Sequence, residues 1–234
     1  MIGFAAYYVS FFYYLILLPF FDPHETEERF RRRLRKAIRF TLRIFGVRLI
    51  VEGSENLCRD MNAIVVANHS SWFDQLAIFV SLDRPITFMA NEKYFKMWGL
   101  ARILRKLECV PICTSSNGEC FSALESLSLG RKLLERGKWL VVYPEGTRSA
   151  RLLPFRRGAA LLAQQTGLPT QSIVIHGAEQ ILPRMKSLFD VRPGEIRLEI
   201  RPPVYKVNGD SARDFIAQIE GDFADIAVCS EPDN

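Results

Sequence analysis

The chain has 234 residues, a length that suits one sizeable domain with a short appendage and that can bury a hydrophobic core. Its hydrophobic content of 48% and mean hydropathy of +0.03 are high for a freely soluble protein. The net charge of +5 is unevenly placed, because positions 29–48 hold nine Arg or Lys residues and no Asp or Glu. The sequence has no internal repeat and no low-complexity segment, so solenoid-type repeat folds and disordered low-complexity chains are excluded.

Positions 1–21 carry no charged side chain and are rich in bulky and aromatic residues. A helix of 21 residues just reaches across a bilayer, and tyrosines along it also suit the lipid–water interface. The segment lacks a basic start and a small-residue cleavage site, so we do not expect a removed signal peptide. The alternative is a helix buried in a protein core.

A second helix is predicted after the break at positions 22–23. Its apolar residues recur at spacings of three and four, with arginines between them; they are Phe30, Leu34, Ile38, Leu42 and Phe45. Such a basic amphipathic helix can place its apolar face in lipid and its arginines against anionic headgroups. A solvated charged face is an alternative, and a nucleic-acid patch is disfavoured because the basic block directly follows an apolar segment. We therefore expect residues 1–46 to anchor the protein on the cytoplasmic face of a membrane, ahead of a domain at 47–234.

Strand-like and helix-like runs alternate through the rest of the chain. This alternation predicts an α/β fold with a mixed, mostly parallel sheet flanked by helices. The predicted strands cover residues 47–52, 63–67, 86–90, 109–112, 139–143, 172–176 and 195–201. The predicted helices cover residues 72–81, 99–106, 119–136, 158–166 and 212–228.

The sequence NHSSWFD at positions 68–74 lies between a predicted buried strand and a predicted helix. If His69 lies in the turn and Asp74 in the first helical turns, the carboxylate can accept a hydrogen bond from one ring nitrogen. The other nitrogen is then free to act as a base toward a hydroxyl, even one of the substrate. On one continuous helix these two positions would point about 140° apart and would not meet. A histidine and an aspartate at this spacing also occur often by chance, so the pattern needs a second motif beside it.

A second motif, PEGTRS at positions 144–149, follows the predicted strand at 139–143. Its glycine lets backbone amides approach an anion closely, and its arginine offers two parallel donors that suit a phosphate. Glu145 could orient that arginine or accept a hydrogen bond from a substrate hydroxyl. Arg156 and Arg157 add two cations at the start of a predicted helix, where anions also bind. The alternative is an ordinary turn with a surface ion pair.

The blocks NHSSWFD and YPEGTR, with FRRGAALLA after them, together resemble the glycerolipid acyltransferase family, typified by 1-acyl-glycerol-3-phosphate acyltransferase. The resemblance covers about residues 47–201, and the N-terminal helical pair resembles that family's membrane-docking element. It implies transfer of a fatty acyl group from a thioester, on coenzyme A or acyl carrier protein, to the hydroxyl of a lysophospholipid. The implied partners are membrane phospholipids and the acyl donor, with no cofactor, no metal and no nucleic acid. No oligomeric state is indicated.

Carried over by position, the resemblance makes His69 the general base and Asp74 the carboxylate that orients it. The residues that it assigns to substrate binding are Lys93, Glu145, Gly146, Thr147, Arg148 and Arg157. The groups that would stabilise the oxyanion of the reaction are not evident from the sequence.

One departure from the family concerns the acceptor. Members usually carry an arginine after the fourth core strand, where this chain reads VPICT at positions 110–114. The acceptor can therefore be 1-acyl-glycerol-3-phosphate or another lysolipid, and Arg102, Arg105 or Lys106 could replace the arginine. Two other functions stay open: a thioester hydrolase, in which water is the acceptor, and a lipid-binding module without catalysis.

Overall fold

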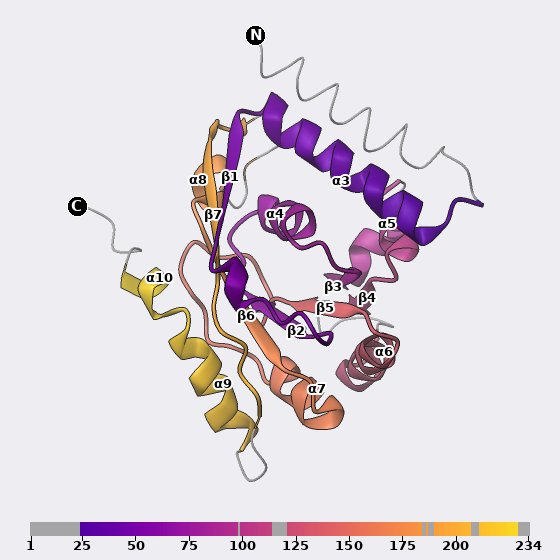
Figure 1. The fold of residues 1–234 in the computed structure, drawn as a ribbon, viewed down its shortest axis with the longest axis vertical. Coiled ribbons are helices and arrows are strands. Elements are labelled where there is room, and N and C mark those ends of the chain that lie inside the picture. The colour runs from indigo at the N-terminus through magenta and orange to yellow at the C-terminus, as the bar shows by residue number, and fades with distance from the viewer. Residues whose placement is uncertain are drawn as a thin grey trace.

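The computed structural model describes residues 24–97, 99–113, 121–183, 186, 190–206 and 211–228 (Figure 1). The predicted apolar helix at positions 1–21 lies outside the described residues. Among the helices of the described ranges, none has both the length and the apolar character needed to cross a bilayer.

The described residues form one seven-stranded sheet with helices around it. The strands are β1 (Val47–Glu52), β2 (Ile64–Ala67), β3 (Ile86–Asn91), β4 (Val110–Ile112), β5 (Trp139–Val142), β6 (Thr170–His176) and β7 (Gly194–Ile200). The α-helices are α3 (Glu27–Ile44), α4 (Phe73–Ser81), α5 (Leu100–Lys106), α6 (Ala123–Glu135), α7 (Gly158–Thr166), α8 (Ala178–Ile181), α9 (Ala212–Gly221) and α10 (Ala224–Val228). Two short 3₁₀ helices, η2 (Ser54–Asn56) and η3 (Glu92–Lys96), follow β1 and β3.

The strand order in the sheet is β1-β7-β6-β2-β5-β3-β4. Every neighbouring pair is parallel except β6 and β7, which are antiparallel. The five strands from β6 to β4 therefore run in one direction, and β1 and β7 run in the other. This arrangement confirms the predicted α/β fold with a mixed, mostly parallel sheet.

Helices cover both faces of the sheet, as Figure 1 shows, so alternate residues of a central strand enter two separate cores. In β2, Val65 and Ala67 pack toward α3, α4 and α8, whereas Ile64 and Val66 pack toward α6, α7 and α9. Because both faces are buried, the strand is apolar throughout rather than alternating. The sheet thus gives the loops at its ends a rigid support.

The apolar face of α3 packs on protein, because Phe30, Leu34, Ile38 and Leu42 belong to the core and the helix contacts α4 and β1. Its arginines are partly used in the same contact: Arg31 is 6% exposed and donates to the carbonyl of Ile86. The expectation that this face enters lipid is therefore wrong. The 3.6-residue period of the sequence identifies an apolar face, but it does not show whether lipid or protein covers that face. The division of the chain at residue 46 stays a prediction, since residues 1–23 lie outside the described residues.

The C-terminal helix differs from its prediction as well. The sequence predicts one helix over residues 212–228, whereas the chain forms α9 and α10 with a break at Asp222. After the break, Phe223 is fully buried and its ring packs edge-on against Phe155 at a centroid distance of 5.2 Å.

Candidate active site

The two sequence motifs meet at one edge of the sheet. His69 follows β2, and the PEGTRS turn follows β5. These two strands are parallel neighbours, so their carboxyl ends lie side by side although 76 positions separate His69 from Glu145. The carboxyl edge of a parallel sheet is where such folds usually bind ligands. A backbone hydrogen bond of 2.8 Å from the N–H of Ser149 to the carbonyl of His69 joins the two turns.

The ring of His69 contacts the carboxylate of Asp74, as the spacing predicts. Nδ1 of His69 lies 2.8 Å from Oδ2 of Asp74. The same oxygen accepts hydrogen bonds of 2.8 Å from the backbone N–H groups of Ser70 and Ser71, and Asp74 is fully buried. The carboxylate therefore fixes a proton on Nδ1 and leaves Nε2 as the basic nitrogen. Their catalytic roles stay predictions.

Tyr143, the residue after β5, covers one face of the imidazole ring. The two rings are stacked, with centroids 4.1 Å apart and an interplanar angle of 19°. The hydroxyl of Tyr143 is buried and has no hydrogen-bond partner among the described residues. Burial raises the pKa of this phenol well above its usual range, and the nearby Asp74 carboxylate raises it further. Sequence reasoning did not single out Tyr143, because an aromatic residue at a strand end is ordinarily a packing residue.

Glu145 connects the two motifs through the backbone. One carboxylate oxygen accepts a hydrogen bond of 2.7 Å from the N–H of His69, and the other accepts one of 3.0 Å from the N–H of Leu153. Burial raises the pKa of Glu145 to about 7; the two amide hydrogen bonds lower it, and the charge of Asp74 raises it. With both oxygens occupied, this geometry suits a residue that positions the His69 turn better than one that binds phosphate.

The glycine of the second motif makes a tight turn. Gly146 has a positive φ of 72°, and its N–H donates to the carbonyl of Tyr143 at 3.1 Å. A Cβ atom at this position would lie 2.7 Å from the guanidinium carbon of Arg156. Arg156 therefore covers the turn. The sequence placed both Arg156 and Arg157 at a helix start where anions bind, and the family resemblance assigned only Arg157 to substrate binding. Arg157 is exposed at the start of α7 and does not line the cavity described below.

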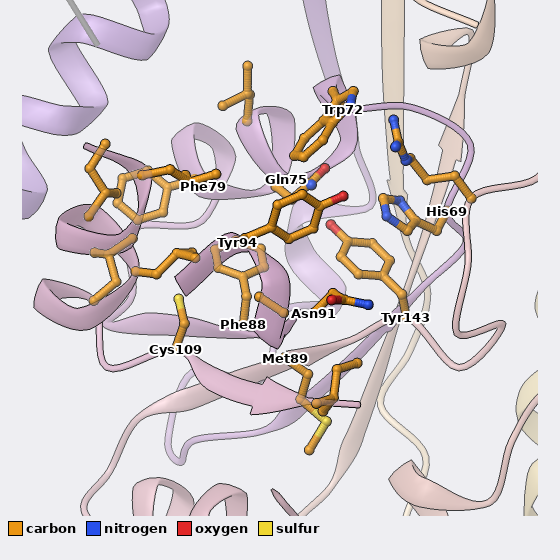
Figure 2. Close-up of a pocket in the computed structure, with 18 of the residues that line it drawn as sticks. His69, Trp72, Gln75, Phe79, Phe88, Met89, Asn91, Tyr94, Cys109 and Tyr143 are labelled. Carbon is orange, nitrogen blue, oxygen red and sulfur yellow. The ribbon is translucent and has the colours of Figure 1, made fainter. Parts of the chain in front are cut away.

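A cavity of about 460 Å³ opens beside these residues (Figure 2). Its lining includes polar groups, among them His69, Lys93, Thr147 and Arg148. His69 lies at one end, together with Trp72 and Tyr143 (Figure 2). The guanidinium of Arg148 lies 4.5 Å from the ring centroid of Trp72, a cation–π contact that orients it. The other end, where Figure 2 shows Phe79, Phe88 and Cys109, is apolar. Apolar lining comes from α3, α4, β3 and α5, with Leu34, Ile38, Phe79, Phe88, Ile103 and Leu107.

The proposed replacements for the missing family arginine do not line this cavity. Arg105 donates to the carbonyl of Phe95 at 3.1 Å, and Lys106 donates to the carbonyl of Glu25 at 2.6 Å. Lys93 and Arg148 are thus the cations that the described residues bring to the cavity. Within the described ranges, no three His, Cys, Asp or Glu side chains gather closely enough to hold a metal ion.

Comparison with known proteins identifies relatives of this chain. A 1-acyl-sn-glycerol-3-phosphate acyltransferase of Bacillus subtilis is 28% identical over 159 residues, which cover 68% of this chain and 74% of that protein. The enzyme of the same name from Limnanthes douglasii is 31% identical over 165 residues, covering 69% of this chain and 56% of the relative. A chloroplastic one from Brassica napus is 29% identical over 175 residues, covering 72% and 49% respectively. The chain thus spans about half the length of several relatives.

A solved structure shares the fold. The crystal structure of the 1-acyl-sn-glycerophosphate (LPA) acyltransferase PlsC from Thermotoga maritima matches with a TM-score of 0.78 and 23% identity, covering 100% of this chain and 97% of that one. A family model described as Acyltransferase matches residues 48–176, which include β2, β5 and both motifs. That match spans more than half of the sequence, and the chain therefore belongs to the acyltransferase family.

Proposed function

We propose that the protein transfers a fatty acyl group from a thioester, carried by coenzyme A or acyl carrier protein, to the free hydroxyl of 1-acyl-glycerol-3-phosphate. The observation that carries this proposal is the contact of 2.8 Å between Nδ1 of His69 and Oδ2 of Asp74 at the mouth of a cavity with a cationic end and an apolar end. The names of the relatives support the same reaction.

The reaction begins at Nε2 of His69. This nitrogen takes the proton of the acceptor hydroxyl while the oxygen attacks the thioester carbonyl, and a tetrahedral intermediate forms. Asp74 keeps the ring oriented and stabilises the imidazolium. When the intermediate collapses, the carbon–sulfur bond breaks and the thiolate takes the proton from His69. Acyl transfer is then complete, and the dyad is restored.

The phosphate of the acceptor would bind at the cationic end. Arg148 offers two parallel N–H donors, and its stacking on Trp72 limits the orientations it can adopt. Gly146 and Thr147 of the same turn also line the cavity. An acyl chain would occupy the apolar end, where burial of each methylene contributes about 0.8 kcal/mol.

The proposed location is a membrane surface, as the lipid substrate requires. Residues 1–21 carry no charge, and residues 29–48 are strongly basic. Because the apolar face of α3 packs in the core, lipid contact would fall to the uncharged N-terminal segment and to the exposed basic side chains. Flotation of the full chain with vesicles that contain anionic lipid tests this part separately.

An acceptor panel tests the reaction. The purified protein receives one labelled acyl-coenzyme A and, in separate tubes, lysophosphatidate, lysophosphatidylglycerol, lysophosphatidylcholine or no acceptor, and the lipids are identified by mass spectrometry. Labelled phosphatidate from lysophosphatidate alone is the expected product. Free fatty acid with every acceptor would indicate a hydrolase instead, and a diacyl product from a different lysolipid would reassign the acceptor. Repeating the panel with acyl–acyl carrier protein identifies the carrier.

A further inference from the structure

Tyr143 combines three properties that its position after a buried strand does not require. Its ring is stacked on the ring of His69 with centroids 4.1 Å apart. Its hydroxyl is buried and lacks a hydrogen-bond partner among the described residues. It also lines the cavity that holds His69 and Arg148. Figure 2 shows this hydroxyl at the end of the ring that points away from the backbone and into the cavity.

A buried hydroxyl without a partner destabilises the folded protein, because it has lost its hydrogen bonds to water. Phenylalanine would fill the same space and make the same stack without this cost. Buried polar groups without a hydrogen-bond partner are rare in native proteins, so each one requires an explanation. For a hydroxyl that faces a ligand cavity, the explanation can be that an atom of the bound ligand becomes its hydrogen-bond partner.

The proposed reaction needs a donor at this place. Attack on a thioester converts the carbonyl oxygen into an oxyanion, which is stabilised by a donor that already points to it. The reacting carbon lies within reach of Nε2 of His69 during attack, and the Tyr143 ring is parallel to the imidazole and in contact with it. Burial holds the pKa of the Tyr143 phenol well above its usual range, so the hydroxyl keeps its proton at neutral pH and serves as a donor.

We propose that Tyr143 is a further catalytic residue, whose hydroxyl donates a hydrogen bond to the oxyanion of the tetrahedral intermediate. The inference rests on the proposed acyl transfer. The proton stays on Tyr143 throughout: His69 accepts the proton of the attacking hydroxyl and returns it to the departing thiolate. The π electrons of the carbonyl move to its oxygen and return when the carbon–sulfur bond breaks.

The test compares wild type with Tyr143→Phe, which removes the hydroxyl and retains the ring. We expect kcat to fall on the order of 100-fold, with unchanged KM for lysophosphatidate and for acyl-coenzyme A. The melting temperature should be equal or higher, since an unpartnered polar group is removed. Tyr205→Phe is the matched control, because Tyr205 is 51% exposed and does not line the cavity.

A second measurement separates an oxyanion donor from a residue that only supports the His69 ring. A phosphonate analogue, in which phosphorus replaces the tetrahedral carbon, should bind Tyr143→Phe more weakly by the same factor by which kcat/KM falls. Tyr143→Leu, which also loses the stack, should be slower than Tyr143→Phe. Two results would overturn the proposal: a wild-type kcat in Tyr143→Phe, or loss of kcat without weaker phosphonate binding. If wild type itself forms no acylated lipid, the proposed function fails instead.

Discussion

Replacing Glu145 by Gln tests whether the link between the two motifs is a buried carboxyl with a raised pKa. The side chain is 4% exposed and its pKa is raised from 4.5 to about 7, chiefly by burial. Between these pH values the folded chain holds a proton that the unfolded chain has lost, so stability falls as pH rises through this window. The difference corresponds to about 3 kcal/mol once the pH is above both values.

Gln carries no titrating proton, so Glu145→Gln should lack this fall. Near pH 5 the variant should be less stable than wild type, because both oxygens of Glu145 accept backbone N–H groups and the amide of Gln offers a single acceptor oxygen. Between pH 5 and pH 8 the free energy of unfolding of wild type should fall by about 2–3 kcal/mol relative to that of the variant. Urea-induced unfolding, followed by circular dichroism at pH 5, 6, 7 and 8 with comparison of m-values, measures the difference.

Glu125→Gln provides a control of opposite sign. Glu125 forms a capping box with Ser122. Hydrogen bonds from the backbone and the side chain of Ser122 lower the pKa of the Glu125 carboxyl. Its stabilisation is present above the ordinary carboxyl pKa and is lost as pH falls, so Glu125→Gln should lose stability at pH 8 relative to pH 4. A difference between Glu145→Gln and wild type that stays constant from pH 5 to 8 would refute the raised pKa of Glu145.

Three further changes test the site. Asp74→Asn should lower kcat about 10³–10⁴-fold with little change in KM, because the His69 ring loses the carboxylate that fixes its tautomer. Steady-state kinetics measure this change, and a fall in kcat of less than about 10-fold would contradict it. Arg148→Lys should raise the KM for lysophosphatidate by about 10-fold or more, since a single ammonium lacks two parallel donors, while the KM of the acyl donor stays unchanged. Gly146→Ala should destabilise the protein by about 1–2 kcal/mol, because a φ of 72° is strained for alanine, whereas the exposed Arg156 side chain near the Cβ position can move; an unchanged melting temperature would argue against this turn geometry.

The sheet could be predicted from the sequence because its strands are short apolar runs that polar turns separate. The stretch at 63–67 is a clear case, since both faces of β2 are buried. The contact of His69 with Asp74 was also predictable, because a turn followed by a helix brings these two positions together over five residues. Both inferences depend only on local geometry.

The contacts that could not be predicted from the sequence depend on which strands become neighbours in the sheet. Glu145 reaches the N–H of His69 only because β2 and β5 are adjacent, and sequence order does not reveal strand order. The choice between Arg156 and Arg157 has the same origin: adjacent side chains at a helix start point in different directions, and only the fold decides which one covers the Gly146 turn. Hydrophobic periodicity likewise identified the apolar face of α3 without distinguishing a lipid surface from the protein core.

The role of His69 as the base is tested by the rate at which His69→Ala forms labelled phosphatidate from lysophosphatidate and acyl-coenzyme A, measured beside wild type under saturating substrates. We expect the variant to keep the circular dichroism spectrum and melting behaviour of wild type and to lose transfer by at least about 10³-fold, because general-base catalysis and the oriented proton path are both removed. A folded His69→Ala protein that retains most of the wild-type rate would contradict the assignment of this imidazole as the base.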